Sequence, residues 1–296
     1  MKTFSLLAFL TLLLPSTAVA MPIGFVYDGS QYTIYTQFTN TRFLGINDAG
    51  TIVGGQTPGT PGSFGVVVQD GVLTRYDFGF GLTGSGVSFH DIDSNGVIVG
   101  SGIIGDGYSS FVVRDGEVTS RFHYGFTGIN DAGIIVSHDK LFTASGDSDV
   151  PHSELNTAYT SFNFPGADST HAADINNSNV IAGSFMDGFQ LYGFVGDTVL
   201  PALPGGLFVT GLNDVGQVVG FTAELDSFLY DSHTGALTRF AHPHFPTFAQ
   251  GINNNGMIVG YVDVQVPEPS TLLLLGMAVG PLGFCRWRRR RHEPLD

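Results

Sequence analysis

A ten-residue motif that recurs six times constrains the fold of this chain more than any other feature of its sequence. The first copy reads GINDAGTIVG, and the second position is Ile or Leu in every copy. The copies begin at Gly45, Asp91, Gly128, Asp174, Gly211 and Gly251. Successive copies start 46, 37, 46, 37 and 40 residues apart. A period of about 40 residues predicts one supersecondary unit that packs against copies of itself.

The middle of the motif predicts a tight turn between two short strands. In the first copy Asn47–Gly50 separates apolar residues on both sides. Position six is glycine in five copies and Asn179 in the other, and these residue types adopt positive φ most readily. We therefore expect a left-handed residue there, in a type I turn with a bulge. Position three is Asn or Asp in all copies, which predicts a side chain that caps the turn.

A second hairpin lies upstream of most copies of the motif. Asp-Gly pairs between apolar runs mark it at Asp28-Gly29, Asp70-Gly71 and Asp115-Gly116. Each unit is therefore expected to contain four strands, as a β-propeller blade does. The 41 glycines and only 13% charged residues also favour short strands and turns over long helices. We predict an all-β fold, a six-bladed β-propeller over residues 21–264, with an open β-solenoid as the alternative.

The first 20 residues predict a secretory signal peptide. Lys2 precedes an apolar run from Phe4 to Leu14, and Ala18 and Ala20 supply small residues at a cleavage site. We expect signal peptidase of the general secretion machinery to cut after Ala20, so that an exported chain begins at Met21. An uncleaved anchor is the alternative, but this apolar run is short for a hydrocarbon core of about 30 Å.

The last segment, residues 265–296, predicts a C-terminal transmembrane helix with a sorting signal. Pro267, Glu268 and Pro269 precede an apolar span, Ser270 to Trp287. Five arginines lie at the end of this span: Arg286, Arg288, Arg289, Arg290 and Arg291. Arginines after an apolar span indicate a cytoplasmic C-terminus, which places the preceding domain outside. An ordinary single-pass anchor is the alternative.

This ordered tail resembles the PEP-CTERM sorting signal of Gram-negative bacteria over residues 264–291. The resemblance implies a partner, an exosortase, which is a membrane-embedded cysteine peptidase-like enzyme that cleaves near the Pro-Glu-Pro. It also implies transient anchoring in the inner membrane, followed by release or transfer to the cell surface or the exopolysaccharide matrix of a biofilm. Residues 292–296, which follow the arginines, depart from the pattern.

The repeats resemble the HAF repeats of extracellular bacterial proteins over residues 23–264. The shared features are an aromatic residue that opens a hairpin and the GINxxGxIVG motif. The His-Ala-Phe opening is reduced here to pairs such as Gly24-Phe25, Ser110-Phe111, Gly193-Phe194 and Ser227-Phe228. This resemblance implies export and repetition but no activity.

The charge and the single cysteine exclude two classes of protein. Of 12 basic and 26 acidic residues, Lys2, the five arginines, Glu268, Glu293 and Asp296 lie in the ends, so residues 21–266 carry a net charge of −17. A domain this acidic repels nucleic acid, whose binding depends on cationic side chains. The only cysteine, Cys285, lies in the tail, so no disulfide is expected to stabilise the domain.

Chemical motifs are few. The second copy contains Asp91, Asp93 and Asn95 before a glycine, which matches the start of a calcium loop and predicts calcium ligands. Gly102 stands where such a loop needs a bidentate Glu, so an Asx-capped hairpin is the favoured alternative. We expect no other cofactor, because the chain contains no HExxH, GxSxG or phosphate-binding P-loop motif.

These features favour a non-catalytic surface or matrix protein that binds or organises extracellular polysaccharide. The alternative is an extracellular glycosidase or lyase, with carboxylates that converge on one face of the ring. Exposed aromatic side chains in the loops before the motifs would stack on sugar rings. The candidates are Phe78, Phe80, Phe122, Tyr124, Phe162, Phe164, Phe240 and Phe245.

Overall fold

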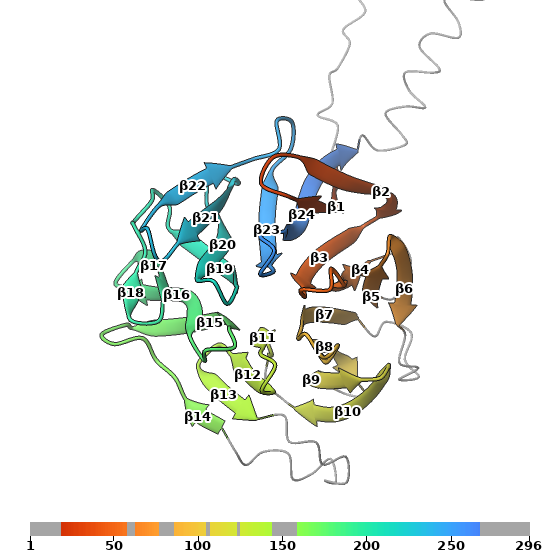
Figure 1. The fold of residues 1–296 in the computed structure, drawn as a ribbon, viewed down its shortest axis with the longest axis horizontal. Coiled ribbons are helices and arrows are strands. Elements are labelled where there is room, and N and C mark those ends of the chain that lie inside the picture. Colours follow the sequence, from red (N-terminus) through yellow and green to blue (C-terminus); the bar gives the residue numbers. More distant parts are fainter. Residues whose placement is uncertain are drawn as a thin grey trace, which may run out of the picture. The chain divides into compact units, whose positions relative to one another are not determined.

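The structure, a computed structural model, describes residues 19–57, 63–76, 86–104, 107–122, 125–143 and 159–266. These residues form six four-stranded sheets and contain no helix. The sheets are arranged as blades around a central axis (Figure 1). We call the space along this axis, which is lined by residues of all six blades, the channel. The chain divides into a propeller unit, Pro22–Val264, and a second unit made of the two terminal segments. The six-bladed propeller is therefore confirmed over the solenoid, whereas the predicted C-terminal helix lies outside the described residues.

The blades are numbered along the chain from the first motif. Blade one contains β3 (Thr41–Ile46), β4 (Ile52–Gln56), β5 (Phe64–Gln69) and β6 (Val72–Tyr76). Blade two contains β7 (Val87–Ile92), β8 (Ile98–Ile104), β9 (Gly107–Arg114) and β10 (Glu117–Phe122). Blade three contains β11 (Gly128–Ile129), β12 (Ile134–Ser137), β13 (Lys140–Thr143) and β14 (Tyr159–Ser161).

The remaining blades follow the same order except the last. Blade four contains β15 (Ser169–Ile175), β16 (Ile181–Asp187), β17 (Gln190–Val195) and β18 (Thr198–Val199). Blade five contains β19 (Leu207–Leu212), β20 (Gln217–Thr222), β21 (Ser227–Asp231) and β22 (Leu237–Phe240). Blade six contains β23 (Thr247–Ile252), β24 (Ile258–Val266), β1 (Val19–Tyr27) and β2 (Tyr32–Thr39).

Each blade combines a motif with the hairpin that follows it, not with the hairpin that precedes it. The two motif strands are the inner pair, and the third strand pairs antiparallel with the second, as β21 does with β20. The connection between them is short, as in residues 223–226, so pairing within one sheet closes a small loop. The hairpin before the first motif, β1–β2, therefore belongs to blade six and closes the ring.

The core lies between strands and between blades, and phenylalanine rings fill much of it. The largest fully buried side chains include Phe25, Phe43, Phe89, Phe111, Phe126, Phe194 and Phe228. Motif position ten is glycine opposite several of these rings. A Cβ on Gly220 would lie 2.8 Å from the Phe228 ring, and one on Gly260 would lie 2.9 Å from Phe25. These glycines make room for the rings, and in blade six the same contact secures β1 against β24.

Candidate functional site in the central channel

The six motif turns lie at one end of the channel, which we call the motif face. The residue at position six has positive φ in every turn, between 61° at Asn179 and 81° at Gly96. Gly50 donates its amide to the Asn47 carbonyl at 3.0 Å, and Asn47 Oδ1 accepts from the Thr51 amide at 3.0 Å. The predicted left-handed residue and the predicted side-chain cap are both confirmed.

Position three also joins each blade to the next. Asn47 Nδ2 donates to the carbonyl of Asp93 at 3.1 Å, so one amide side chain caps its own turn and holds the next. Equivalent bonds of 3.0–3.3 Å run from Asn130 to Asn176, Asn176 to Asn213, Asn213 to Asn253 and Asn253 to Asn47. Asp93 is the exception, because an ionised carboxylate accepts hydrogen bonds but does not donate them. The position-three side chains thus form a ring of hydrogen bonds between blades, which we call the amide ring. One link of this ring is missing, between Asp93 and Asn130.

Position four forms a second ring on the motif face. Carboxylates at Asp48, Asp131 and Asp214 alternate with Ser94, Asn177 and Asn254. Asn254 Nδ2 donates to Asp48 and Asp214, both at 2.8 Å, and Asn177 Nδ2 donates to Asp131 at 2.8 Å and to Asp214 at 2.9 Å. The amides separate the like charges, so this acidic rim is balanced by hydrogen bonds within the ring.

Two further carboxylates, Asp91 and Asp174, lie in the channel wall. Each accepts the amide that follows it and an amide of the next blade, Ile129 at 2.9 Å or Leu212 at 2.8 Å. Burial raises the pKa of Asp91 to about 7. Burial and, next, the charge of Asp91 raise the pKa of Asp174 well above its usual value.

The predicted calcium ligands are all engaged in this hydrogen-bonding scheme. Asp93 Oδ1 accepts from the amides of Asn95 at 2.9 Å and Val97 at 2.7 Å, and the Asn95 side chain donates to Asp93 Oδ2 at 3.4 Å. Both Asp91 oxygens accept backbone amides. Among the described residues, no group of three or more His, Cys, Asp or Glu side chains is arranged to hold a metal. Calcium binding stays a prediction.

The channel contains two cavities that share part of their lining. One, of about 70 Å³, lies toward the motif face and includes Asp91 and Asp174. The other, of about 210 Å³, lies toward the opposite end, which we call the loop face because residues such as 223–226 turn there. Residues that directly precede a motif line both cavities: Leu44, His90, Thr127, Thr210 and Gln250.

A strip of aromatic side chains borders the channel on the loop face of blades five and six. Phe208 stacks on Phe221 with ring centroids 5.0 Å apart and planes at 10°. Phe221 meets Phe248 edge to face at 5.3 Å, and Phe248 stacks on Tyr261 at 4.9 Å. Arg42 of blade one lies 5.0 Å from the centre of the Tyr261 ring. We call these four rings the aromatic strip. Phe208 is 40% exposed, and the other three rings are half-buried.

Buried serines fix the backbone on both sides of the two inner-strand rings. The Ser184 hydroxyl donates to the Leu207 carbonyl at 2.9 Å and accepts the Val209 amide at 3.0 Å, so it brackets Phe208. Ser227 makes the same pair of bonds to Thr247 and Ala249, at 3.0 and 2.9 Å, and brackets Phe248. The strip is therefore held in place before any ligand arrives.

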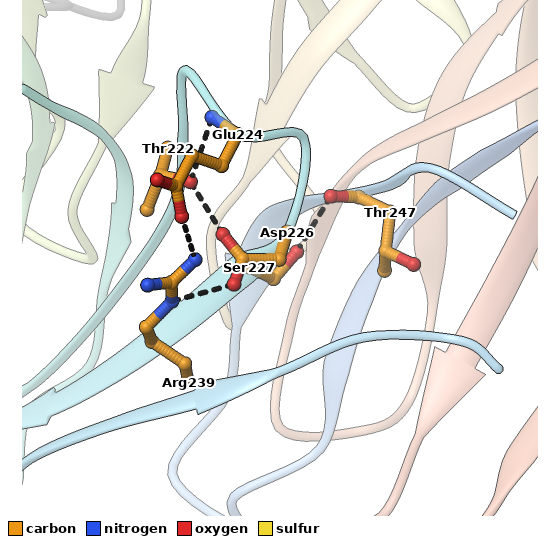
Figure 2. Close-up of polar contacts among 6 residues, drawn as sticks. All are labelled: Thr222, Glu224, Asp226, Ser227, Arg239 and Thr247. Carbon is orange, nitrogen blue, oxygen red and sulfur yellow. Dashed lines mark hydrogen bonds and ion pairs between the residues drawn. The ribbon is translucent and has the colours of Figure 1, made fainter. Parts of the chain in front are cut away.

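Polar contacts also order the loop that follows Phe221. Figure 2 shows the Thr222 hydroxyl bonded to Asp226, and Arg239 bonded to both Glu224 and Asp226. The Glu224 amide donates to the Thr222 hydroxyl at 3.1 Å, and Arg239 Nε donates to Asp226 at 2.6 Å. Against the burial that raises it, hydrogen bonds from Arg239 and Thr222 leave the pKa of Asp226 below its usual value. The loop beside the strip is thus rigidly bonded.

The aromatic residues singled out from the sequence lie elsewhere. Phe164 is buried, and Phe162 packs against the same core cluster. Phe240 stacks on Tyr27 at 5.0 Å, and Phe245 stacks on His242 at 4.9 Å. No side-chain position is described for Phe122, and Phe78, Phe80 and Tyr124 lie outside the described residues.

Sequence reasoning missed the aromatic strip, although a signal for it exists. The third residue before a motif pairs with the residue directly after the motif, as Phe208 does with Phe221 and Phe248 with Tyr261. Both positions are aromatic only in the fifth and sixth copies. Aligning the repeats from three residues before the motif to one residue after it, with strand pairing in mind, would have revealed the strip.

The C-terminal segment of the chain indicates how the protein is sorted. Residues 265–290 match the model of the PEP-CTERM protein-sorting motif. The chain carries an exosortase sorting signal. This PEP-CTERM motif marks an exported protein that is processed by an exosortase. No curated protein matches the chain.

The processing positions predicted from the sequence lie mostly outside the described residues. These are Ala18 and the PEP-CTERM residues from Pro267 onward. Ala20 lies within β1, and the pairing of β1 with β2 begins at Ile23, so a cut after Ala20 would leave that ladder intact. Within the described part of the chain, no helix is long and apolar enough to cross a bilayer.

Proposed function

We propose that this PEP-CTERM protein displays a non-catalytic propeller that binds extracellular polysaccharide through the aromatic strip. The observation that carries the proposal is the row of four rings, pre-positioned and partly exposed beside the channel. Aromatic faces offer flat apolar area at little cost in conformational entropy, and the C–H faces of sugar rings are complementary to them. The resemblance of the repeats to HAF repeats of extracellular proteins is consistent with this role.

The charge of the domain favours a neutral polysaccharide. Residues 21–266 carry a net charge of −17, because only six of the chain's 12 basic residues lie there against 23 of its 26 acidic residues. A uronic-acid polymer would meet a repulsive field over most of the surface. Arg42, beside the Tyr261 ring, is a cation at one end of the strip.

Two observations support a binding role over a glycosidase or lyase. Asp91 and Asp174, whose pKa values are raised by burial, use their oxygens to hold backbone amides of neighbouring blades. They also line the smaller of the two cavities, whose volume of about 70 Å³ leaves little room for a substrate. We therefore assign these carboxylates a structural role.

The same proposal includes the final location of the protein. The apolar span after Pro269 would hold the precursor in the inner membrane with the arginines in the cytoplasm. Exosortase cleavage near the Pro-Glu-Pro would then free the propeller for the cell surface or the exopolysaccharide matrix.

The test is affinity electrophoresis of the full-length chain, purified after export, in gels that contain hydroxyethyl cellulose, dextran or alginate. We expect retardation by a neutral polymer and none by alginate. Phe208→Ala and Phe248→Ala should each weaken binding about twofold to tenfold, as expected for about 0.5–1.5 kcal/mol per aromatic contact. Phe189→Ala is the matched control, since Phe189 is fully exposed and outside the strip. Equal binding by all three variants would contradict the proposal.

A further inference from the structure

The larger channel cavity, of about 210 Å³, opens at the same end of the channel as the aromatic strip. Its lining residues include His171, Val209 and Gln250. His171 is the third residue before its motif, and it therefore occupies in blade four the position that Phe208 and Phe248 occupy in blades five and six. Equivalent positions of blades in a ring lie at the same height along the axis. Phe208 and Phe248 thus lie at the same height along the axis as His171, at the loop-face end of this cavity.

The channel narrows on the motif side of this cavity. The residues that directly precede the motifs line both cavities there, where five inner strands carry a β-bulge. Thr127 Oγ1 donates to the Ala172 carbonyl at 2.9 Å, and Thr210 Oγ1 donates to the Ala249 carbonyl at 3.0 Å, so both hydroxyls are bonded to the wall. The cavity on the motif side has a volume of only about 70 Å³. A polymer that enters from the loop face therefore meets much less space toward the motif face.

Gln250 supplies an unused polar group at the base of this space. Its side-chain amide makes no hydrogen bond to another described residue. An amide presents both donors and an acceptor, which suits the vicinal hydroxyls of a sugar. The apolar side chains of Leu44, Ala173 and Val209 form much of the remaining wall. Apolar walls with a few placed polar groups are typical of small-ligand sites.

We propose that this cavity holds the terminal sugar of a neutral glycan while the aromatic strip stacks on the sugars that follow. The inference rests on the proposed function and adds to it a preference for chain ends. About 210 Å³ gives room for a sugar ring, and the cavity of about 70 Å³ beyond it leaves little room for the chain to continue, which favours a residue with a free end. Gln250 hydrogen-bonds the hydroxyls of the terminal sugar. The aromatic strip adds affinity but does not distinguish a free chain end from a blocked one.

The test is isothermal titration calorimetry of the full exported chain with cellohexaose, laminarihexaose and maltohexaose. The hexaose that binds is then compared with two end-modified forms, one with an ethylidene group on the non-reducing terminus and one reduced at the other end. We expect one of the two modifications to weaken binding at least tenfold. Gln250→Ala should lower the affinity for the unmodified hexaose about tenfold, and this variant should bind the unmodified and end-modified hexaoses equally well. Phe248→Ala should lower the affinity for all three forms of the hexaose by the same factor.

The outcomes separate this inference from the proposed function. Equal affinity for all three forms, together with weaker binding by Phe248→Ala, would overturn chain-end recognition and leave polysaccharide binding in place. Absence of binding to every hexaose and every neutral polymer would overturn both. Ala173→Leu, which adds volume to the cavity wall, gives a second check: it should weaken the unmodified hexaose more than the end-blocked form.

Discussion

At the scale of single residues, asparagine at motif position three bonds in two directions at once. Its oxygen caps the turn of its own blade, and its NH₂ group holds the turn of the next blade, as Asn213 does toward Asn253 at 3.0 Å. An aspartate performs only the first task. Asp93 is only 5% exposed, and its burial raises its pKa, so its charged form is disfavoured in the folded state.

Asp93→Asn should therefore stabilise the propeller. The substitution supplies the missing donor to the Asn130 carbonyl and removes a poorly solvated charge. We expect a gain of about 0.5–1.5 kcal/mol in the free energy of unfolding, the usual net contribution of one hydrogen bond. Urea denaturation measures it, and Asn130→Asp, which opens a second link, should lose a similar amount. A less stable Asp93→Asn protein would contradict this account of the ring.

Asp91→Asn tests the effect of the carboxylate in the channel wall. Burial raises the Asp91 pKa from 3.8 to about 7, so its contribution to stability is complete below about pH 4 and is lost as the pH rises to about 7. The melting temperature of the variant minus that of the wild type should therefore increase over this range and then level off. Burial lowers the pKa of His90, so this residue makes stability rise with pH. Because His90 is present in both proteins, its effect cancels in the difference.

Thermal unfolding followed by circular dichroism between pH 4 and 8 gives these difference curves. Val72→Ala, at an exposed position without an ionisable side chain, is the control and should give a flat difference. A flat difference for Asp91→Asn as well would show that this carboxylate titrates at its ordinary pKa. Repeating the wild-type melt with calcium chloride and then with a chelator also tests the calcium prediction. We expect little change, because the oxygens of Asp91 and Asp93 already accept backbone amides.

At the scale of elements, the turn at the motif face depends on one left-handed residue. Gly256 has φ of +76°, and a Cβ there would meet no atom within 4 Å. A substitution at this position therefore strains the backbone without causing a steric clash. Gly256→Ala should lower the free energy of unfolding by about 1–2 kcal/mol. Gly256→Asn should cost less, because Asn179 adopts φ of +61° at the same position of its own turn. Urea denaturation of both variants measures the difference, and equal costs would argue against a backbone origin.

At the scale of the whole molecule, the ring closes through strands from the two ends of the chain. Blade six takes its inner pair, β23 and β24, from the C-terminal part and its outer pair, β1 and β2, from the N-terminal part. The closing contacts include the amide link from Asn253 to Asn47 and the packing of Phe25 against Gly260. The two ends of the propeller unit, Pro22 and Val264, thus lie in neighbouring strands of one blade.

A chain that starts at Thr41 should fail to form a stable ring. It lacks two of the four strands of blade six, so β24 would expose an unpaired edge, and the core would lose Ile23 and Phe25. We expect aggregation or a strongly lowered melting temperature by size-exclusion chromatography and thermal unfolding. A chain that ends at Gln265 is the matched control, because the β23–β24 ladder needs no residue beyond Val262. Wild-type behaviour of the Thr41 chain would contradict closure by β1 and β2.

The repeated motif by itself determined the number of blades, the turn geometry and the capping role of position three. Those features depend on contacts within ten residues, where glycine, asparagine and strand periodicity act locally. The sorting signals were equally legible, since linear order and apolar length define them.

Only the tertiary structure decided which hairpin shares a sheet with each motif, that β1 completes the last blade, and that Phe208, Phe221, Phe248 and Tyr261 form one surface. The last two outcomes join parts of the chain that are far apart in the sequence, and both depend on the arrangement of the ring, which no local pattern encodes. The second role of Asn47 and its counterparts is of the same kind: the donor is local, but its acceptor lies one blade away. The sequence did not predict these contacts because the residues that make them lie far apart along the chain, and not because the interactions are weak.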